Sequence, residues 1–448
     1  MESGMPHQDK EDLRTPLDQL KEVLGPVTSA DLKGVKRHGN SVIDGPAIAM
    51  LALLTFGWGR FKTLGERFAV ARDATTRLLP CDKIAASHQA LMVTLRSCSE
   101  TLIQSIHSQL VTQLKVSSKW LFLRRPTFAV DGSQFAVPRT KQNLAHFAAA
   151  SRKSKAAYKK QSDYAKAKST QIAVSLCMHL TTCLPFLWNT GGSADSERGL
   201  LLGMLDRLPA GSRLVMDAYY FGFEFWNRLI EQGFTFVVRA GRNIELLDQL
   251  RAGGKIKCRG NLVLYWPQCV IDIGGKPIVL NMVEVMVGRK RMFLLTNELT
   301  LSDHELSLLY AKRWGIEVFF RTVKQNDERS KMESRTPTNV KLEIQWTLLG
   351  IWLALTIGGQ YIPADKRISP IQILRTLCRL VVDVARKGDR KLNIGKDLSL
   401  CVAADESNRR SEKNSESYPR KKRKKPIGDP IVKPISNTLR NLAMKHMS

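Results

Sequence analysis

Short apolar segments alternate with amphipathic segments from residue 127 onward, and this alternation constrains the fold more than any other feature of the sequence. The segments with the length and composition of strands are 127–130, 134–138, 170–179, 184–188, 212–216, 234–239 and 292–295. Helices are expected at 194–208, 223–232 and 306–325. Strands that alternate with helices are typical of an α/β fold in which helices cover a sheet. The first two segments are expected to form a hairpin around Asp131-Gly132-Ser133.

The flanking regions have a different character. Residues 47–116 have helical periodicity and predict a small helical domain. A helix-turn-helix over 74–95 is an alternative there, but the absence of a clear turn signal favours a plain helical bundle. Three further strands, 262–265, 270–273 and 277–287, with Gly-Gly turns, indicate a β-rich insertion. Additional helices are expected at 340–357 and 368–385, and the polar sequence beyond residue 387 predicts a disordered tail.

The charge of the chain points to a phosphate-rich partner. Lys and Arg exceed Asp and Glu by 28 over 448 residues. Residues 139–168 contain nine basic residues and one acid, and residues 409–425 contain nine basic residues and two acids. Because such dense basic segments attract phosphates, we expect nucleic acid binding. The longest apolar stretch, residues 346–359, is shorter than the roughly 20 residues of a membrane span and predicts a buried helix.

One face of the predicted helix 306–325 carries polar residues at a testable spacing. At about 100° per residue, Tyr310, Arg313, Glu317 and Lys324 fall within an arc of about 60°. A carboxylate between two cations and a phenol suits a phosphodiester with a hard cation, because carboxylates bind such cations and Arg and Lys bind phosphate. A solvated helix with an i,i+4 ion pair is the alternative for this face alone.

Two aspartates strengthen the first interpretation. Asp131 and Asp217 each follow a predicted core strand, where side chains of open α/β sheets converge on ligands. Each aspartate alone is typical of a turn or a cap. Together with Glu317 they predict a site for two Mg²⁺ ions, which serve in-line phosphodiester chemistry.

These residues resemble a known family. The spacing of Tyr310, Arg313, Glu317 and Lys324 is similar to the YREK signature of the DDE transposases of bacterial insertion sequences, in the insertion-sequence-four group. Four other segments also resemble that family: Asp131-Gly132-Ser133, 217–220, 296–297 and 334–337. In the segment that corresponds to residues 217–220, many members of the family have Gly or Arg. The resemblance covers about residues 128–359.

The resemblance implies an α/β fold with a ribonuclease-H-like core, a mixed sheet flanked by helices and interrupted by the β-rich insertion. The N-terminal helical domain that precedes this core is expected from the helical periodicity alone. The expected segments are a mobile N-terminal arm (1–45), a helical, DNA-binding candidate domain (46–125), the first part of the core (126–239), the insertion (240–290), the second part of the core (291–360), a helical segment (361–386) and a basic disordered tail (387–448). Asp131, Asp217 and Glu317 are the implied catalytic and metal-binding residues.

The same resemblance implies the DNA contacts. Tyr310, Arg313 and Lys324 are expected to bind phosphates near the transposon end. In the basic loop the candidate DNA-binding residues are Arg152, Lys153, Lys155, Lys159 and Lys160. Some relatives stack a flipped base on a tryptophan of the insertion; Trp266 and Trp314 are candidates, but core aromatic positions are the preferred interpretation.

The predicted function is cut-and-paste DNA transposition. The chain is expected to bind the terminal inverted repeats of its element and the target DNA, to use two Mg²⁺ ions, with Mn²⁺ as an alternative, and to form a dimer in the synaptic complex. Without a secretory signal or a membrane span, the expected location is the bacterial cytoplasm, at the nucleoid. A ribonuclease-H-like nuclease and a catalytically inactive DNA-binding relative are the alternatives.

Overall fold

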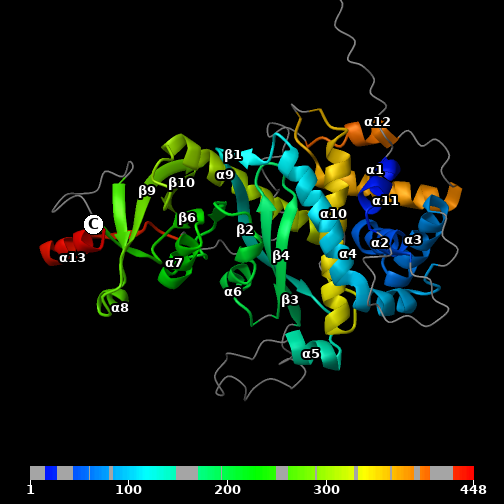
Figure 1. Cartoon of the computed structure of the whole chain (residues 1–448), viewed down its shortest axis with the longest axis horizontal. Coiled ribbons are helices and arrows are strands. Elements are labelled where there is room, and N and C mark those ends of the chain that lie inside the picture. The colour runs from blue at the N-terminus through cyan, green and yellow to red at the C-terminus, as the bar shows by residue number, and fades with distance from the viewer. Residues whose placement is uncertain are drawn as a thin grey trace, which may run out of the picture. The chain divides into compact units, whose positions relative to one another are not determined.

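The computed structural model describes residues 16–27, 44–59, 61–79, 84–147, 170–192, 194–248, 261–287, 290–326, 331–363, 366–387, 394–403 and 427–447. These residues form two compact units. The helical unit comprises Met1–Val116, Ala136–Ala148 and Thr322–Asn408, and the sheet unit comprises Ser117–Phe135, Ala149–Arg321 and Arg409–Ser448. The two units are described separately, and their elements are labelled in Figure 1.

The sheet unit is built on one mixed sheet (Figure 1). Its strands are β1 (Leu121–Phe122), β2 (Arg125–Ala136), β3 (Gln171–His179), β4 (Pro185–Gly191), β5 (Arg213–Met216), β6 (Thr235–Ala240), β7 (Glu245–Asp248), β8 (Asn261–Tyr265), β9 (Ile278–Val287), β10 (Lys290–Thr296) and β11 (Ile431–Pro434). Their order is β11-β7-β8-β9-β10-β6-β5-β2-β3-β4, and β1 pairs with β2. The strand β5 lies parallel to both β2 and β6, whereas β3 and β4 are antiparallel.

The sheet unit also contains helices, some of which pack on its strands. They are α6 (Glu197–Leu202), the 3₁₀ turn η4 (Leu205–Arg207), α7 (Phe223–Glu231), α8 (Gln268–Ile271), α9 (Asp303–Arg321) and α13 (Asn437–Met447). The helix α9 packs on β5, β6 and β9 through an apolar stripe that includes the buried Leu306, Ile316 and Phe319. The helix α6 packs on β3 and β4. The predicted alternation of strands and helices is therefore present in this unit.

The predicted hairpin around Asp131 is wrong. β2 runs without interruption from Arg125 to Ala136, so Asp131-Gly132-Ser133 lies within an extended strand. A two-residue hairpin turn needs a positive φ, which Gly132 does not adopt. Asp131 is consequently a residue of a strand interior.

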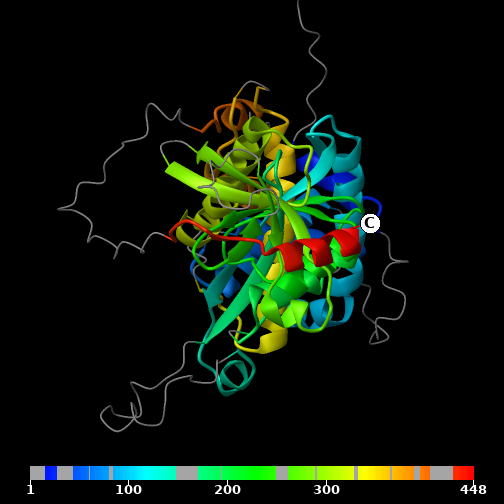
Figure 2. The same ribbon diagram turned by 90° about the vertical axis from the view of Figure 1, so that its left-hand side faces the viewer.

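Two further predictions are wrong. Residues 270–273 were expected to form a strand, but most of them belong to the helix α8 or to its C-cap. The tail beyond residue 387 contains α12 (Ile394–Ser399), β11 and α13. α13 (red in Figure 2) packs through Ala443 on a buried cluster with Leu264 and Trp266, because its weak apolar face has a matching surface in this unit.

The helical unit is organised around one long apolar helix, α10 (Pro337–Gly359). The other elements are α1 (Pro16–Leu24), α2 (Gly45–Ala52), the π-helix η2 (Leu53–Trp58), α3 (Leu64–Leu78), α4 (His88–Val116), α5 (Lys141–Phe147), the π-helix η5 (Thr322–Asn326), α11 (Pro370–Lys387) and α12. α10 is long and apolar enough to cross a membrane by length and composition, but most of it is buried in this unit, which confirms the prediction of a buried helix. α1 lies within the predicted mobile arm and buries Leu17, Leu20 and Leu24, so that prediction is wrong for residues 16–24.

A close backbone contact joins α10 to η2. A Cβ atom on Gly57 would lie 2.6 Å from the Cα of Gly350, so neither position has room for a side chain. The indole nitrogen of Trp58 donates a 2.8 Å hydrogen bond to the carbonyl oxygen of Gly350. The two glycines therefore set the distance at which these helices pack.

Candidate active site

The strand register places two of the predicted acids side by side. Ala129 on β2 pairs with Val215 on β5, and the two strands are parallel. Asp131 and Asp217 each lie two residues further along, so they occupy neighbouring positions on the same face of the sheet. Parallel neighbouring strands are about 4.8 Å apart, which brings the two carboxylates into strong electrostatic contact.

Each aspartate is oriented by a local hydrogen bond. The backbone nitrogen of Gly132 donates to Oδ1 of Asp131 at 2.9 Å, and the backbone nitrogen of Tyr219 donates to Oδ1 of Asp217 at 2.8 Å. In each aspartate, the hydrogen bond occupies one of the two carboxylate oxygens. The second oxygen of each carboxylate is thus left for a ligand.

The environment of Asp131 penalises its negative charge. Burial, and then the charge of Asp217, raises the pKa of Asp131 from 3.8 to about 7. The hydrogen bond from Gly132 and the charge of Arg313 act in the opposite direction, and Glu197 adds to the rise. A bound cation would stabilise the ionised carboxylate of Asp131, because its positive charge offsets both the cost of burying the carboxylate and the repulsion by Asp217.

The strand β5 is held by a buried ion pair at the opposite end from Asp217. The fully buried guanidinium of Arg213 donates to both carboxylate oxygens of Glu298, at 2.7 and 2.8 Å. Asn297, the preceding residue, accepts from the backbone nitrogen of Phe236 at 2.8 Å and donates to the carbonyl oxygen of Phe234 at 3.1 Å. These bonds tie the segment before α9 to β5 and β6, and so position α9.

The helix α9 carries three further predicted residues, Tyr310, Arg313 and Glu317. Nη2 of Arg313 lies 2.5 Å from Oε1 of Glu317, and the guanidinium lies 5.2 Å from the ring centre of Tyr310. Tyr310 and Arg313 are 6% and 8% exposed. Among the described residues, no group forms a hydrogen bond of standard geometry with the buried Nε and Nη1 of Arg313. An anionic oxygen bound beside Arg313 would accept hydrogen bonds from these two donors.

The donor set fits a hard divalent cation in its chemistry, since all three predicted ligands are carboxylates. In the described part of the chain, however, no three His, Cys, Asp or Glu side chains are arranged so that they could hold a metal ion together. The carboxylate of Glu317 is paired with Arg313 in this structure. Glu317 would have to exchange this ion pair for a metal ion, while Arg313 would turn to a phosphate.

Three residues near the aspartates were missed by the sequence analysis. Glu197, the first residue of α6, carries a charge that raises the pKa of Asp131. Tyr220 is fully buried, and its pKa is raised well above 10, first by burial and then by Glu197, Asp131 and Asp217. Arg239 on β6 has a buried Nε that finds no hydrogen-bond partner in the described part of the chain. Burial raises the pKa of Tyr310, and the charge of Arg239 lowers it. An acid at a helix N-terminus and an arginine in a strand are common, so the sequence contained no signal for them.

The roles predicted for Lys324 and for the basic segments stay predictions. Lys324 is a half-buried residue of the π-helix η5, which begins where α9 ends, and the fixed 100° spacing did not anticipate this change of helix type. The basic loop residues Arg152, Lys153, Lys155, Lys159 and Lys160 lie outside the described residues, as does the basic run 409–425. Trp266 is buried, as expected for a core aromatic, but Trp314 is 49% exposed, so its prediction as a core residue is wrong.

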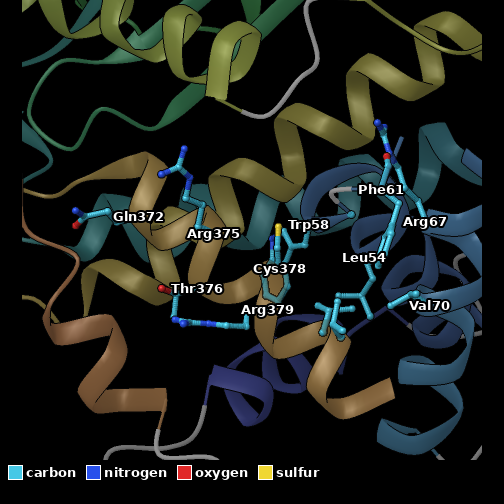
Figure 3. Close-up of a pocket in the computed structure, with 13 residues that line it drawn as sticks. Leu54, Trp58, Phe61, Arg67, Val70, Gln372, Arg375, Thr376, Cys378 and Arg379 are labelled. Carbon is cyan, nitrogen blue, oxygen red and sulfur yellow. The ribbon is translucent and has the colours of Figure 1, made fainter. Parts of the chain in front are cut away.

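A separate cavity lies within the helical unit (Figure 3). Its volume is about 500 Å³, and its walls are mainly residues of η2, α3 and α11, including Trp58, Arg67 and Arg375. None of the predicted site residues lines it.

Comparisons with known proteins identify a family and one similar structure. A family model described as the transposase DDE domain matches residues 123–353, which is more than half of the chain. The cryo-EM structure of a piggyBac transposase synaptic complex with hairpin DNA is similar over 87% of this chain and 85% of that chain, with 10% sequence identity and a TM-score of 0.39. No curated protein matches the sequence.

Proposed function

The chain belongs to the transposase DDE domain family, and we propose that it is a cut-and-paste transposase of the bacterial insertion-sequence-four group with Asp131, Asp217 and Glu317 as its catalytic carboxylates. Members of this family bind DNA and carry out metal-dependent strand cleavage and strand transfer, so the chain is a DNA transposase. The observation that supports the assignment of residues is the register of β2 and β5, in which Asp131 and Asp217 each lie two residues beyond the paired Ala129 and Val215.

The proposed core is ribonuclease-H-like. The strand order β4-β3-β2-β5-β6, with β2, β5 and β6 parallel and β3 and β4 antiparallel, supports this proposal. The strands β7, β8 and β9 lie between β6 and β10 in the sequence, where the insertion was predicted. The boundaries predicted for the individual domains, and a DNA-binding role for residues 46–125, stay part of the proposal.

The carboxylates are proposed to hold two Mg²⁺ ions, or Mn²⁺ in their place. Bound in this way, such ions activate a water or a terminal 3′-hydroxyl as nucleophile and stabilise the leaving 3′-oxygen. Asp131 and Asp217 present one free carboxylate oxygen each, because the other oxygen already accepts a backbone hydrogen bond. Glu317 joins them after its ion pair with Arg313 opens.

Arg313 then holds the DNA phosphate. Its partnerless Nε and Nη1, together with the Nη2 released from Glu317, can donate to non-bridging phosphate oxygens. The ring of Tyr310 lies beside the guanidinium and restricts its orientation. Binding of the scissile phosphate and binding of metal by Glu317 are thus coupled, since each requires the same ion pair to open.

The basic segments and the partners complete the proposal. Residues 139–168 and 409–425 carry dense positive charge and are proposed to track the DNA backbone of the terminal inverted repeats and the target. Two protomers would assemble in the synaptic complex, in the bacterial cytoplasm at the nucleoid. Lys324 is proposed to contact phosphate near the transposon end.

The test is strand cleavage on a labelled plasmid that carries the ends of the element. Wild-type protein is incubated with Mg²⁺ or with EDTA and compared with Glu317→Ala and with the exposed-residue control Glu224→Gln. The proposal predicts Mg²⁺-dependent cleavage at the ends that is retained in the control and lost in Glu317→Ala. Cleavage by Glu317→Ala would refute the assignment, and cleavage without joining to target DNA would indicate a nuclease instead.

A further inference from the structure

The cavity of the helical unit contains none of the residues assigned to catalysis, and its lining has the composition of a ligand-binding site (Figure 3). We propose that this cavity binds a nucleotide, with the base against its apolar lining and the phosphate on arginines of α11. The inference does not rest on the catalytic assignment of Asp131, Asp217 and Glu317, because every residue of the cavity belongs to the helical unit.

Much of the cavity lining is apolar. The indole nitrogen of Trp58 donates its hydrogen bond to the carbonyl oxygen of Gly350, so the ring adds apolar surface to the cavity. The half-buried ring of Phe61 lines the cavity as well. Nucleobases stack on aromatic side chains and fit pockets with apolar walls. The aliphatic residues of the lining are Leu54, Val70, Val381 and Val382.

Three arginines line the same cavity, and they differ in their partners. Arg67 is 6% exposed, and its Nε donates a 2.6 Å hydrogen bond to the carbonyl oxygen of Phe61, so it is a fixed part of the lining. Arg379 forms a 3.3 Å ion pair with Asp397, and a phosphate can replace this exposed acid. Arg375 is exposed and forms no ion pair with an acid of the described residues. The helix α11 therefore supplies two guanidinium groups for an anion.

The exposed face of α11 extends this positive charge beyond the cavity. At about 100° per residue, Arg375, Arg379 and Arg386 fall within an arc of about 40°. All three are exposed. The sequence of α11 contains a single acid, Asp383, which is half-buried and lies about 80° from Arg375 around the helix. A strand with several phosphates, bound at the cavity, would meet further cations along this helix.

The cavity is open to solvent on the side of α11. Gln372, Arg375 and Arg379 line it and are nevertheless exposed in the described structure. In Figure 3, Gln372 and Arg375 lie on the left of the view, and Leu54 and Val70 lie on the right. A phosphate at the arginines thus leaves the apolar part of the cavity for the base. The amide of Gln372 can both donate to and accept from polar groups of a nucleotide.

Size and charge together select the class of ligand. The volume of about 500 Å³ lies within the range of roughly 300 to 1,000 Å³ that is typical of small-ligand sites. None of the residues that line the cavity in the described structure is an acid, so the site suits neither a metal ion nor a basic peptide. An apolar ligand would leave the guanidinium groups beside it without a charged partner. A nucleotide combines a flat ring with a phosphate. A free nucleotide and an unpaired nucleotide of a DNA strand share this chemistry.

The inference is tested with the deoxyribonucleoside monophosphate of 2-aminopurine, whose fluorescence is quenched when its base stacks on an aromatic ring. Full-length wild type, Arg375→Gln, Val70→Phe and the control Arg386→Gln are titrated into this probe. Val70→Phe fills the cavity without a change of charge, and Arg386→Gln makes the same change as Arg375→Gln on the same helix but outside the cavity. The proposal predicts saturable quenching by wild type and by the control. It predicts that Arg375→Gln lowers the affinity about tenfold or more and that Val70→Phe abolishes binding.

Three results would overturn the inference. They are the absence of saturable quenching by wild type, an affinity of Val70→Phe equal to that of wild type, and an equal loss of affinity in Arg386→Gln and Arg375→Gln, which indicates general attraction by a basic surface. Circular dichroism verifies that each variant is folded. Should Val70→Phe fail to fold, Val382→Phe fills the cavity from α11 and decides in its place.

Competition identifies the source of the nucleotide. The bound probe is displaced with thymidine monophosphate, with a short oligothymidine or with inorganic phosphate. Displacement at lower concentration by the oligothymidine assigns the cavity to a DNA strand, and displacement at lower concentration by the monophosphate assigns it to a free nucleotide. Inorganic phosphate that competes as well as either would reveal an anion site without base recognition and would overturn the inference. None of these measurements involves strand cleavage, so their failure leaves the proposed transposase function intact.

Discussion

Removing the charge of Asp131 is expected to stabilise the protein in the absence of metal. In the folded protein, burial and the charge of Asp217 raise the pKa of Asp131 from 3.8 to about 7. Ionisation of Asp131 above pH 7 therefore costs folding free energy, at about 1.4 kcal/mol for each pH unit between the two values. The upper limit is about 4 kcal/mol, and penetration of water into a half-buried site reduces it. Asp131→Asn avoids this cost while it keeps the size of the side chain.

The pH dependence gives the sign of the effect. Below pH 4 the aspartate is neutral in both the folded and the unfolded chain, so Asp131→Asn and wild type should differ little. As pH rises from about 4 to 7, the folded wild type progressively loses stability relative to the variant, and the difference is fully developed at pH 8.

The assay is urea denaturation in EDTA at pH 4 to 8, followed by circular dichroism, with Glu224→Gln as the control. We expect Asp131→Asn to be more stable than wild type by about 2 to 4 kcal/mol at pH 8. Added Mn²⁺ should stabilise wild type more than the variant, because a ligand that binds the folded state raises its stability. An Asp131→Asn variant that is equally or less stable at pH 8 in EDTA would refute the electrostatic account of this site.

Three further changes test individual contacts. Glu298→Gln removes the charged partner of the fully buried arginine on β5 and should destabilise the protein by about 3 kcal/mol or more in urea denaturation. Gly57→Ala forces a Cβ into the backbone of α10 and should lower stability by about 1 to 3 kcal/mol, whereas Gly65→Ala, with open space around its Cβ, should not; equal stabilities would contradict the close contact. Arg313→Lys should lower the cleavage rate about tenfold or more because Lys lacks the forked donors, whereas Arg321→Lys, exposed on the same helix, should leave the rate near wild type.

The sequence contained enough information to predict most of the sheet and the helix that carries Glu317. Helical spacing of three and four residues identified Tyr310, Arg313 and Glu317 as one face of a helix, and α9 brings Arg313 into contact with both other residues. Such local periodicity is visible in the sequence because it depends on neighbours within two turns.

Features that depend on distant residues were not predictable. Glu197 has the sequence context of an ordinary helix N-terminus, and only the fold places it against Gly132, which is 65 positions earlier in the chain. The short apolar run at Val270 has no periodicity that separates a strand from a helix, and it forms part of α8. The residues of α13 have only a weak apolar face and were therefore assigned to a disordered tail. In the fold, α13 is stabilised because it packs on the buried cluster around Trp266.

The most direct test of the central claim, that Asp131 binds the catalytic metal, is a change of metal specificity. Asp131→Cys replaces a hard oxygen ligand with a softer thiolate, which binds Mg²⁺ poorly and accepts Mn²⁺ more readily. Cleavage of labelled transposon ends by Asp131→Cys is measured in Mg²⁺ and in Mn²⁺ beside wild type. The account predicts that cleavage by this variant is lost in Mg²⁺ and partly restored in Mn²⁺. Wild-type rates of cleavage by Asp131→Cys in Mg²⁺ would contradict it.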